Sequence, residues 1–242
     1  MIEILNINKS YNNKVKAVDN LTISIPDGEI IGFLGPNGAG KTTTIKLLTG
    51  ILNADSGVIR INGLDINEKP VEVKKQFGFV PDSPDMFLRL KGIEYLNFMA
   101  DMYDVSTTDR KARIDELADK FEMTSSLSAK IQSYSHGMRQ KIIIIGALIH
   151  DPLVWILDEP MTGLDPKSSF LLKEIMREYA QKNRTVFFST HILEVAEKIC
   201  YRVAIINKGK LISFCTIEEL REQFKGNESL EKMFLELTEE TE

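Results

Sequence analysis

The sequence Gly-Pro-Asn-Gly-Ala-Gly-Lys-Thr occupies residues 35–42 and fits the pattern G-x-x-x-x-G-K-[ST] at every position. An apolar run, residues 29–34, precedes it, and a helical pattern with Ile45, Leu48 and Leu52 on one face follows it. Between a strand and a helix, such a loop lets backbone N–H groups close around a polyphosphate. We therefore expect an α/β fold that binds a nucleotide, rather than a glycine-rich turn that fits the pattern by chance.

Individual residues of this loop have different expected roles. The backbone amides from Asn37 to Lys41 donate hydrogen bonds to the phosphates. The Lys41 side chain reaches the β- and γ-phosphates, and the Thr42 hydroxyl coordinates Mg²⁺. The expected nucleotide-binding residues of the loop are Asn37, Gly38, Ala39, Gly40, Lys41, Thr42 and Thr43.

A second motif is a buried strand that ends in two acids. Residues 153–157 are Leu-Val-Trp-Ile-Leu, a run typical of a strand buried on both faces of a parallel sheet, and Asp158 and Glu159 follow it. In such folds nucleotides bind at the carboxyl ends of the strands. We expect Asp158 to hold Mg²⁺ through water and Glu159 to orient and polarise the attacking water. The alternative is that the two acids simply begin a solvated loop.

The remaining pattern is an α/β chain interrupted by a helical block. Helical periodicity runs from Met86 to about Lys130, with polar breaks at residues 107–109 and 124–126. A helix over residues 142–149 then leads back to alternating strands and helices. The other expected elements are strands at residues 22–25, 57–61 and 185–188, helices after Pro166 and from about Leu193, and a hairpin around residues 208–209.

Composition indicates a globular protein and limits its function. The chain has 242 residues, of which 43% are hydrophobic and 27% charged, and this length suits one full α/β core. The formal net charge of −5 argues weakly against nucleic-acid binding, which depends on neutralising phosphates. The most apolar stretch, residues 142–149, is far shorter than the roughly 20 residues of a membrane-spanning helix, and residues 1–10 show no signal-peptide core. Cys200 and Cys215 lack disulfide or zinc-site spacing and are expected to be buried thiols.

The choice between ATP and GTP depends on one further stretch. A guanine pocket usually contains N-K-x-D, whose acid accepts hydrogen bonds from the base. Here residues 207–210 read Asn-Lys-Gly-Lys, and a lysine cannot accept a hydrogen bond. The stretch is better explained as a hairpin turn, so ATP is the favoured nucleotide.

The order of these motifs resembles the nucleotide-binding subunits of ATP-binding cassette (ABC) transporters over almost the whole chain. The resemblance implies a RecA-like P-loop NTPase core with an antiparallel β subdomain and an inserted α-helical subdomain. The ATPase domain would span residues 1–226, with the helical insert at about residues 86–141. Residues 227–242 would form a C-terminal amphipathic helical extension, with apolar residues at i, i+3, i+4 and i+7: Leu230, Met233, Phe234 and Leu237.

The resemblance also implies three contacts outside the glycine-rich loop. Tyr11 is at the position of an aromatic residue that stacks on adenine; the alternative is a tyrosine packed in the core. Asp82 stands where the family usually has a Gln that touches Mg²⁺ and the attacking water, although a carboxylate is shorter and adds negative charge near the phosphates. His191 is at the position that contacts the γ-phosphate and the water, whereas His136 and His150 are expected to be structural or exposed.

Residues 134–138, Tyr-Ser-His-Gly-Met, resemble the family signature LSGGQ. Ser135 and Gly137 are retained, and they would face the γ-phosphate held by a second subunit, in a head-to-tail pair in which each subunit closes the other's ATP. His136 replaces a Gly of the signature. The alternative, from the residues alone, is that Ser135 only caps the helix that follows. Residues 162–165, Thr-Gly-Leu-Asp, resemble the loop through which the two sites communicate.

The implied activity is Mg²⁺-dependent hydrolysis of ATP coupled to transport. The signature stretch and residues 230–238 resemble the exporter branch, in which the membrane-spanning subunit is a separate chain. The expected partners are an integral membrane permease, which would hold the ATPase at the cytoplasmic face of the membrane, and a second ATPase subunit, either a copy or a close paralogue. No nucleic acid is expected. The rival is a cassette ATPase without a transport role, acting on nucleic acid, ribosomes or a protein assembly; the single cassette, the absence of a heptad run and the acidic charge disfavour it.

Overall fold

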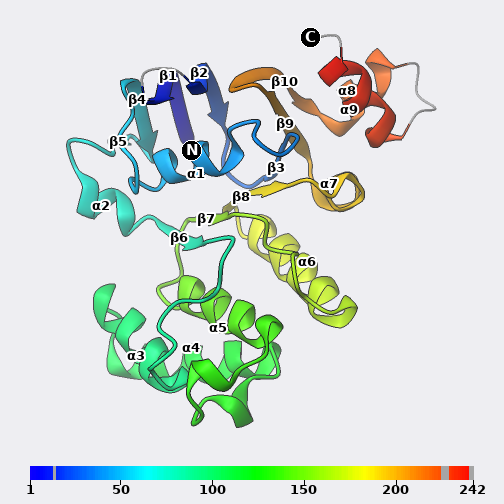
Figure 1. Ribbon diagram of the computed structural model, residues 1–242. Helices are drawn as coiled ribbons and strands as arrows, with labels where there is room; N and C mark the ends of the chain where they lie inside the picture. Colours follow the sequence, from blue (N-terminus) through cyan, green and yellow to red (C-terminus); the bar gives the residue numbers. More distant parts are fainter. Residues whose placement is uncertain (13–14, 225–228, 240–242) are drawn as a thin grey trace.

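A six-stranded sheet forms the centre of the molecule (Figure 1). The computed structural model describes residues 1–12, 15–224 and 229–239. In spatial order the strands are β10 (Lys210–Thr216), β9 (Arg202–Asn207), β3 (Ile30–Leu34), β8 (Thr185–Thr190), β7 (Val154–Leu157) and β6 (Phe77–Val80). The strands from β9 to β6 are parallel, and β10 is antiparallel to β9. Every residue of β3, β7 and β8 is buried, so these strands carry mostly apolar side chains; Thr185, Ser189 and Thr190 of β8 are buried polar exceptions. The loops that follow the parallel strands therefore meet at one edge of the sheet.

A second, antiparallel sheet covers one side of this core. Its order is β2 (Val15–Ile25), β1 (Ile2–Tyr11), β4 (Ser56–Ile61) and β5 (Leu64–Asp65). The side chains of Ile4 and Ile23 from this sheet share one apolar cluster with Phe33 of β3 and with Ile45 of α1 (Lys41–Leu48). The helix after the glycine-rich loop is thus packed in the same core as both sheets. The antiparallel β unit is present as predicted.

A helical layer lies below the sheets in Figure 1 and consists of α3 (Gly92–Met102), α4 (Thr107–Lys120) and α5 (His136–Leu148). Its apolar side chains, such as Tyr95 of α3 and Ile114 of α4, belong to the same core cluster as Trp155 of β7. The helical insert predicted from periodicity is therefore present, and it is packed onto the α/β core. Short 3₁₀ turns at residues 124–126 and 131–133 connect α4 to α5.

Two boundaries in this layer differ from the prediction, and both differences come from capping. Residues 107–109, predicted as a polar break, form the first turn of α4, because Ser106 accepts a hydrogen bond from the Asp109 amide at 3.1 Å. The helix predicted over residues 142–149 begins six residues earlier, at His136. Its N-cap is Ser135, whose hydroxyl accepts a hydrogen bond from the Met138 amide at 3.3 Å. A polar residue at such a position satisfies an amide that has no partner inside the helix.

The remaining helices lie around the central sheet. They are α2 (Pro70–Lys74), α6 (Pro166–Gln181), α7 (Leu193–Ile199), α8 (Ile217–Gln223) and α9 (Leu230–Glu239). In α9, Leu230 and Met233 are buried and Phe234 and Leu237 pack beside them, as the periodicity predicts. The predicted domain boundary at residues 226 and 227 lies outside the described residues. Within the described ranges, each helix is too short or too polar to cross a bilayer.

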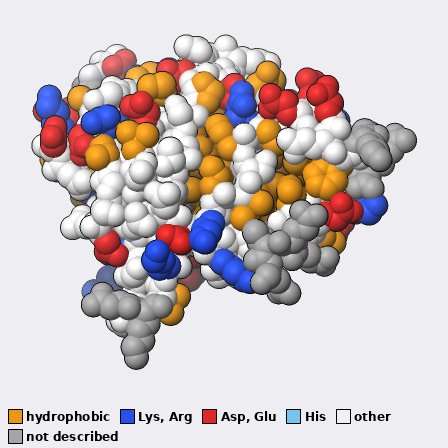
Figure 2. All heavy atoms as spheres, turned by 90° about the horizontal axis from the view of Figure 1, so that it is seen from above, with side chains coloured by type: hydrophobic (Ala, Val, Ile, Leu, Met, Phe, Trp, Pro, Cys, Tyr) orange, Lys and Arg blue, Asp and Glu red, His pale blue; other side chains and the backbone are white. Residues whose placement is uncertain are grey.

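The face seen in Figure 2 is the upper face of Figure 1. Hydrophobic side chains gather in its middle, and acidic and basic side chains lie around them. They lie over the region where β10 approaches the C-terminal helices, and the partly exposed Ile212 of β10 packs against the cluster that also contains Phe224 and Phe234. The β10 edge of the central sheet and the C-terminal helices thus share an apolar cluster.

Candidate functional site

A cavity of about 310 Å³ opens at the edge of the central sheet where the parallel strands end. It is lined by Ala17, Pro36, Asn37, Gly38, Gly40, Lys41, Thr42, Thr43, Asp82 and Glu159. Most of the residues predicted to bind the nucleotide are therefore neighbours in space. The glycine-rich loop, Asp82 just after β6 and Glu159 after β7 all reach this cavity, although they are far apart in the sequence.

The glycine-rich loop has a backbone shape that only small residues permit. Gly40, the N-cap of α1, has a φ of +106°, and a Cβ at this position would overlap the carbonyl oxygen of Ala17. Gly38 also has a positive φ of +82°. Ala39, whose amide is also predicted to bind phosphate, lies within the turn of this loop. Its side chain is buried, and its amide donates a hydrogen bond to the Pro36 carbonyl at 3.1 Å within the turn.

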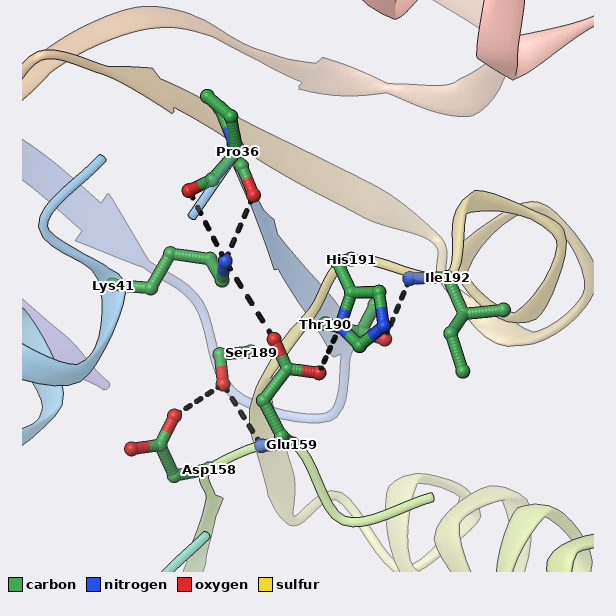
Figure 3. Close-up of polar contacts among 9 residues, drawn as sticks. Pro36, Lys41, Asp158, Glu159, Ser189, Thr190, His191 and Ile192 are labelled. Atoms are coloured by element: carbon green, nitrogen blue, oxygen red, sulfur yellow. Dashed lines mark hydrogen bonds and ion pairs between the residues drawn. The ribbon is translucent and has the colours of Figure 1, made fainter. Parts of the chain in front are cut away.

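Lys41 lies inside the loop, with only 7% of its surface exposed. Its ammonium group donates to the Gly35 carbonyl at 2.8 Å and to the Pro36 carbonyl at 3.4 Å. The same nitrogen is 3.6 Å from the Glu159 Oε1 atom (Figure 3). A buried cation held this closely among oxygen atoms is positioned to bind anionic phosphate oxygens that enter the cavity.

Glu159 has a backbone conformation that is uncommon for a residue with a side chain. Its φ is +48°, in the left-handed region. Two hydrogen bonds hold it there: its amide donates to the Ser189 hydroxyl at 2.9 Å, and its carbonyl accepts from the Thr162 amide at 3.2 Å. The carboxylate then lies between Lys41 and His191, whose Nδ1 is 2.9 Å from Oε2 (Figure 3). Backbone strain of this kind is found preferentially at functional sites.

Asp158 lies beneath the cavity and is 2% exposed. The Ser189 hydroxyl donates to its Oδ1 atom at 2.5 Å. Burial raises the pKa of the Asp158 carboxyl, and the nearby carboxylates of Asp82 and Glu159 add to that rise, while hydrogen bonds from Ser189 and Thr42 oppose it. Ser189 therefore connects both acids, a role that sequence reasoning missed. The only signal was its place at the end of a buried strand, directly before Thr190 and His191.

The donor set of the site suits Mg²⁺. The Thr42 hydroxyl and the carboxylates of Asp158 and Asp82 are hard oxygen ligands, which this cation prefers. Among the described residues, no group of three or more His, Cys, Asp or Glu side chains could hold a metal ion by itself. Mg²⁺ is usually bound by one or two carboxylates together with substrate phosphates and water.

Tyr11 lies at the end of β1, beside the glycine-rich loop. It is 43% exposed, and its hydroxyl is 3.5 Å from the Thr43 hydroxyl. The alternative of a tyrosine packed in the core is therefore wrong. The ring is available next to a predicted nucleotide-binding residue.

Ser135 and Gly137 lie elsewhere, at the start of α5. Among the described residues, neither of them lines the cavity. Ser135 is exposed and caps α5, so the capping interpretation is correct as far as it goes. The helix start is fixed by Arg139, whose guanidinium lies 2.6 Å from the Asp85 carboxylate, three residues after Asp82. One chain thus presents a complete glycine-rich half and, separately, an exposed Ser-His-Gly stretch.

Comparison with known proteins identifies the family of this arrangement. The sequence pattern of the family described as "ABC transporter" matches residues 18–162, more than half of the chain. The matched region runs from β2 through the glycine-rich loop, the helical insert and both acids after β7.

Curated relatives match over most of the chain. The ABC transporter ATP-binding protein NatA of Bacillus subtilis is 34% identical over 239 residues, covering 97% of each chain. The Nod factor export ATP-binding protein I of Paraburkholderia xenovorans is 35% identical over 216 residues, covering 88% of this chain and 69% of that protein.

Solved structures have the same fold. One, described as the ATP-binding subunit of an ABC transporter, superposes with a TM-score of 0.93 at 32% identity and covers 98% of this chain and 99% of its own. Another, a dimeric ATP-binding cassette in a post-hydrolysis state with ADP and Pi, gives a TM-score of 0.82 at 22% identity and covers 90% of this chain and 99% of its own. At 22% identity, the second structure shows only that the fold is shared.

Proposed function

The chain belongs to the ABC transporter family as an ATP-binding subunit, and from this premise we propose that it hydrolyses Mg·ATP to power export through a separate membrane permease. The observation that carries the proposal is the meeting of Lys41, Asp82 and Glu159 in one cavity, with the Lys41 ammonium 3.6 Å from the Glu159 carboxylate. A phosphate-binding cation and a carboxylate base lie within reach of the same small substrate.

The chemistry follows from the positions of these groups. The amides of the glycine-rich loop and Lys41 bind the β- and γ-phosphates, and the Glu159 carboxylate accepts a proton from a water aligned with the γ-phosphorus. His191 holds the Glu159 carboxylate through its hydrogen bond and orients it toward that water. Ser189 fixes Asp158 and the Glu159 backbone together, so the two acids keep a constant separation.

Thr42, Asp158 and Asp82 would hold Mg²⁺ together with the phosphates. When bound, Mg²⁺ neutralises charge that develops on the phosphate oxygens during transfer. Asp82 gives this chain one more negative charge than the amide usual at its position, so the cation also has a larger charge to offset here.

The active form is a pair of cassettes in which Ser135 and Gly137 of one subunit close the nucleotide on the other. The positions of Ser135 and Gly137 support this proposal. Ser135 is exposed, Gly137 is partly exposed, and both lie away from the cavity of their own chain. A related fold has been solved as a dimer. The neighbouring cassette is either a second copy of this chain or a close paralogue. ATP binds the closed pair better than the open one, and this difference shifts the population of the permease between two access states.

The surface of the helical insert is suited to the permease. Four large apolar side chains on and before α3 are exposed: Met86, Phe87, Phe98 and Met102, the last at 61%. The rings of Phe87 and Phe98 are 5.7 Å apart, so they form one patch. Apolar side chains grouped in this way are typical of protein–protein contacts. Docking there would hold the chain at the cytoplasmic face of the membrane.

Co-purification from detergent-solubilised membranes tests the transport role. We expect the wild-type chain to recover a polytopic membrane protein and Phe98→Ser to recover about tenfold less, because the apolar patch loses an aromatic anchor. Phe170→Ser, at an exposed phenylalanine on α6, is the matched control and should recover as much as the wild type. Mg·ATP binding should be equal in all three. Repeated recovery of soluble proteins alone would contradict the transport role, while an ATPase assay tests hydrolysis separately.

A further inference from the structure

One contact joins the Ser-His-Gly stretch to the segment that follows the catalytic acids within the same chain. A Cβ built on Gly163 would lie 2.6 Å from Nε2 of His136 and closer still to its Cδ2 atom. A real Cβ does not approach another heavy atom this closely, so the imidazole ring occupies the space that any side chain at residue 163 would need. A Cβ on Gly137 would in turn lie 3.3 Å from the Gly163 carbonyl oxygen. The two loops are therefore in direct contact at His136 and Gly163.

Gly163 is held firmly on both sides. Four residues before it is Glu159, whose carbonyl accepts a hydrogen bond from the Thr162 amide at 3.2 Å. Two residues after it is Asp165, which caps α6 by accepting a hydrogen bond from the Ser168 amide at 3.0 Å. Gly163 itself has a φ of +76°. Its position is thus set by the strained acid on one side and a helix start on the other.

The backbone that carries the exposed His136 ring is fixed at a helix start. His136 is the first residue of α5, directly after the N-cap Ser135. Arg139, one turn along, donates from Nη2 to the Gln132 carbonyl at 2.9 Å and bonds to the Asp85 carboxylate. The ring that lies on Gly163 therefore projects from a fixed helix terminus. Movement of either loop must be transmitted to the other or must separate the pair.

We propose that His136 is a positioning residue that links the two half-sites of one subunit, and that its ring packs on Gly163 because this residue has no side chain. The inference rests on the proposed function, in which Ser135 closes the nucleotide of the neighbouring subunit. When a nucleotide in the subunit's own cavity changes the position of Glu159, the Thr162–Asp165 segment moves with it, and so does Gly163. The His136 ring then sets where Ser135 and Gly137 lie for the neighbour's nucleotide. Each site thereby influences the other through the subunit that they share.

A double-mutant cycle tests the contact itself. The four chains are the wild type, Gly163→Ala, His136→Ala and the combination, and the measured quantity is the midpoint of unfolding in urea. We expect Gly163→Ala to lower the midpoint more while His136 is present than in the combination, because alanine at residue 136 lacks the ring atoms that obstruct a Cβ. Equal losses in both backgrounds would show that the ring and Gly163 do not interact.

Gly63 provides a matched control for the backbone. Its φ is +78°, close to that of Gly163, but a Cβ there would meet nothing within 4 Å. Gly63→Ala therefore measures the cost of alanine at a positive φ without an obstruction. In the His136→Ala background, Gly163→Ala should cost no more than Gly63→Ala does. A larger cost in that background would overturn the pairing of His136 with Gly163.

The functional part of the inference is tested by His136→Ala alone, with the ATP dependence of hydrolysis as the readout. We expect Mg·ATP binding to the isolated subunit to be unchanged, the Hill coefficient to fall toward one, and kcat to fall by about fivefold with KM little altered. A Hill coefficient and kcat equal to those of the wild type would refute the link between half-sites, even if the contact were real. A wild-type chain that neither binds nor hydrolyses ATP would instead contradict the proposed function.

Discussion

The two halves of the proposed nucleotide site differ in how much of each is bonded within one chain. In the glycine-rich half, Lys41, Asp158 and Glu159 are buried or nearly so, and each polar group already contacts another group of the site. In the half that begins at Ser135, the serine is exposed, and its hydroxyl accepts a hydrogen bond from the Met138 amide at 3.3 Å as the cap of α5. In the first half, the polar groups are held in place within one chain. In the second half, the only such order within the described ranges comes from the start of α5.

This difference indicates which steps each half can carry out alone. A preorganised pocket of amides and a buried ammonium group can bind a nucleotide within one subunit, because the cost of ordering those groups has been met during folding. An exposed serine at a helix start can act on a phosphate only if another chain brings the phosphate to it. Under the proposed function, we therefore expect nucleotide binding to need one subunit and turnover to need two.

Glu159→Gln is expected to have the largest effect and to separate turnover from nucleotide binding. The amide keeps the shape of the side chain but cannot accept the proton of water, so kcat should fall by about 1000-fold. Mg·ATP should still bind, and the closed dimer should accumulate because hydrolysis no longer opens it. Turnover and size-exclusion chromatography with Mg·ATP measure both effects. Glu174→Gln, at a partly exposed glutamate on α6, is the control. Near-normal turnover of Glu159→Gln would remove Glu159 from the base role.

Lys41→Ala should disable the glycine-rich half. The variant loses the one cation that approaches Glu159 from the loop, and it leaves the Gly35 and Pro36 carbonyls without that partner. We expect Mg·ATP affinity to fall by about 100-fold, which corresponds to roughly 3 kcal/mol. Equilibrium binding of a fluorescent ATP analogue measures this. Lys46→Ala, at an exposed lysine of the same helix, should bind as the wild type does; equal affinity of the Lys41 and Lys46 variants would contradict the role of Lys41.

Ser135→Ala should affect the other half only. The hydroxyl is predicted to donate to a phosphate in the neighbouring subunit, and the loss of such a charge-assisted bond should weaken ATP-driven dimerisation by about tenfold. Nucleotide binding to the isolated subunit should not change. The lost cap costs about 1 kcal/mol of folding stability, so the unfolding midpoint must be measured in parallel. Ser133→Ala removes a nearby exposed hydroxyl and should dimerise normally. A drop in subunit affinity with unchanged dimerisation would reverse the assignment of Ser135.

Tyr11→Ala is expected to have the smallest effect. The exposed ring beside Thr43 should stack on the base, and its loss should reduce ATP affinity by about fivefold, or ~1 kcal/mol. Tyr201→Ala, at another exposed tyrosine, is the control. Triphosphate without a base should bind equally to the wild type and Tyr11→Ala. If the substitution weakened the binding of triphosphate as much as that of ATP, stacking of Tyr11 on the base would be excluded.

The features predicted correctly from the sequence are those encoded by local pattern. The strand–loop–helix at residues 29–48 follows from an apolar run, glycines and helical spacing, and α9 follows from four periodic apolar residues. The helix predicted over residues 142–149 was placed six residues too late because its bounds were taken from the apolar run; the cap at Ser135, which the sequence also suggested, determines the start of α5.

Other features of the site depend on contacts between distant residues. Ser189 bonds to Asp158 across 31 positions, and the Glu159 φ of +48° depends on that same hydroxyl. The contact of His136 with Gly163 likewise joins residues that no periodicity relates. Such pairings are set by tertiary packing, and a single sequence does not reveal which residues will meet.

The shared site is tested most directly by mixing two variants, Lys41→Ala and Ser135→Arg. A pair of identical variants has no intact site, because each composite site lacks either the ammonium group or the serine. A mixed pair has one intact site, formed by Lys41 of the second variant and Ser135 of the first. We predict that each variant alone has little Mg·ATP turnover and that mixing them restores it to no more than about a quarter of the wild-type rate at random pairing, because half of the pairs are mixed and each of these has one intact site of two, coupled to an inactive one. Turnover in the mixture that stays at the level of the separate variants would contradict a site completed by two copies of this chain.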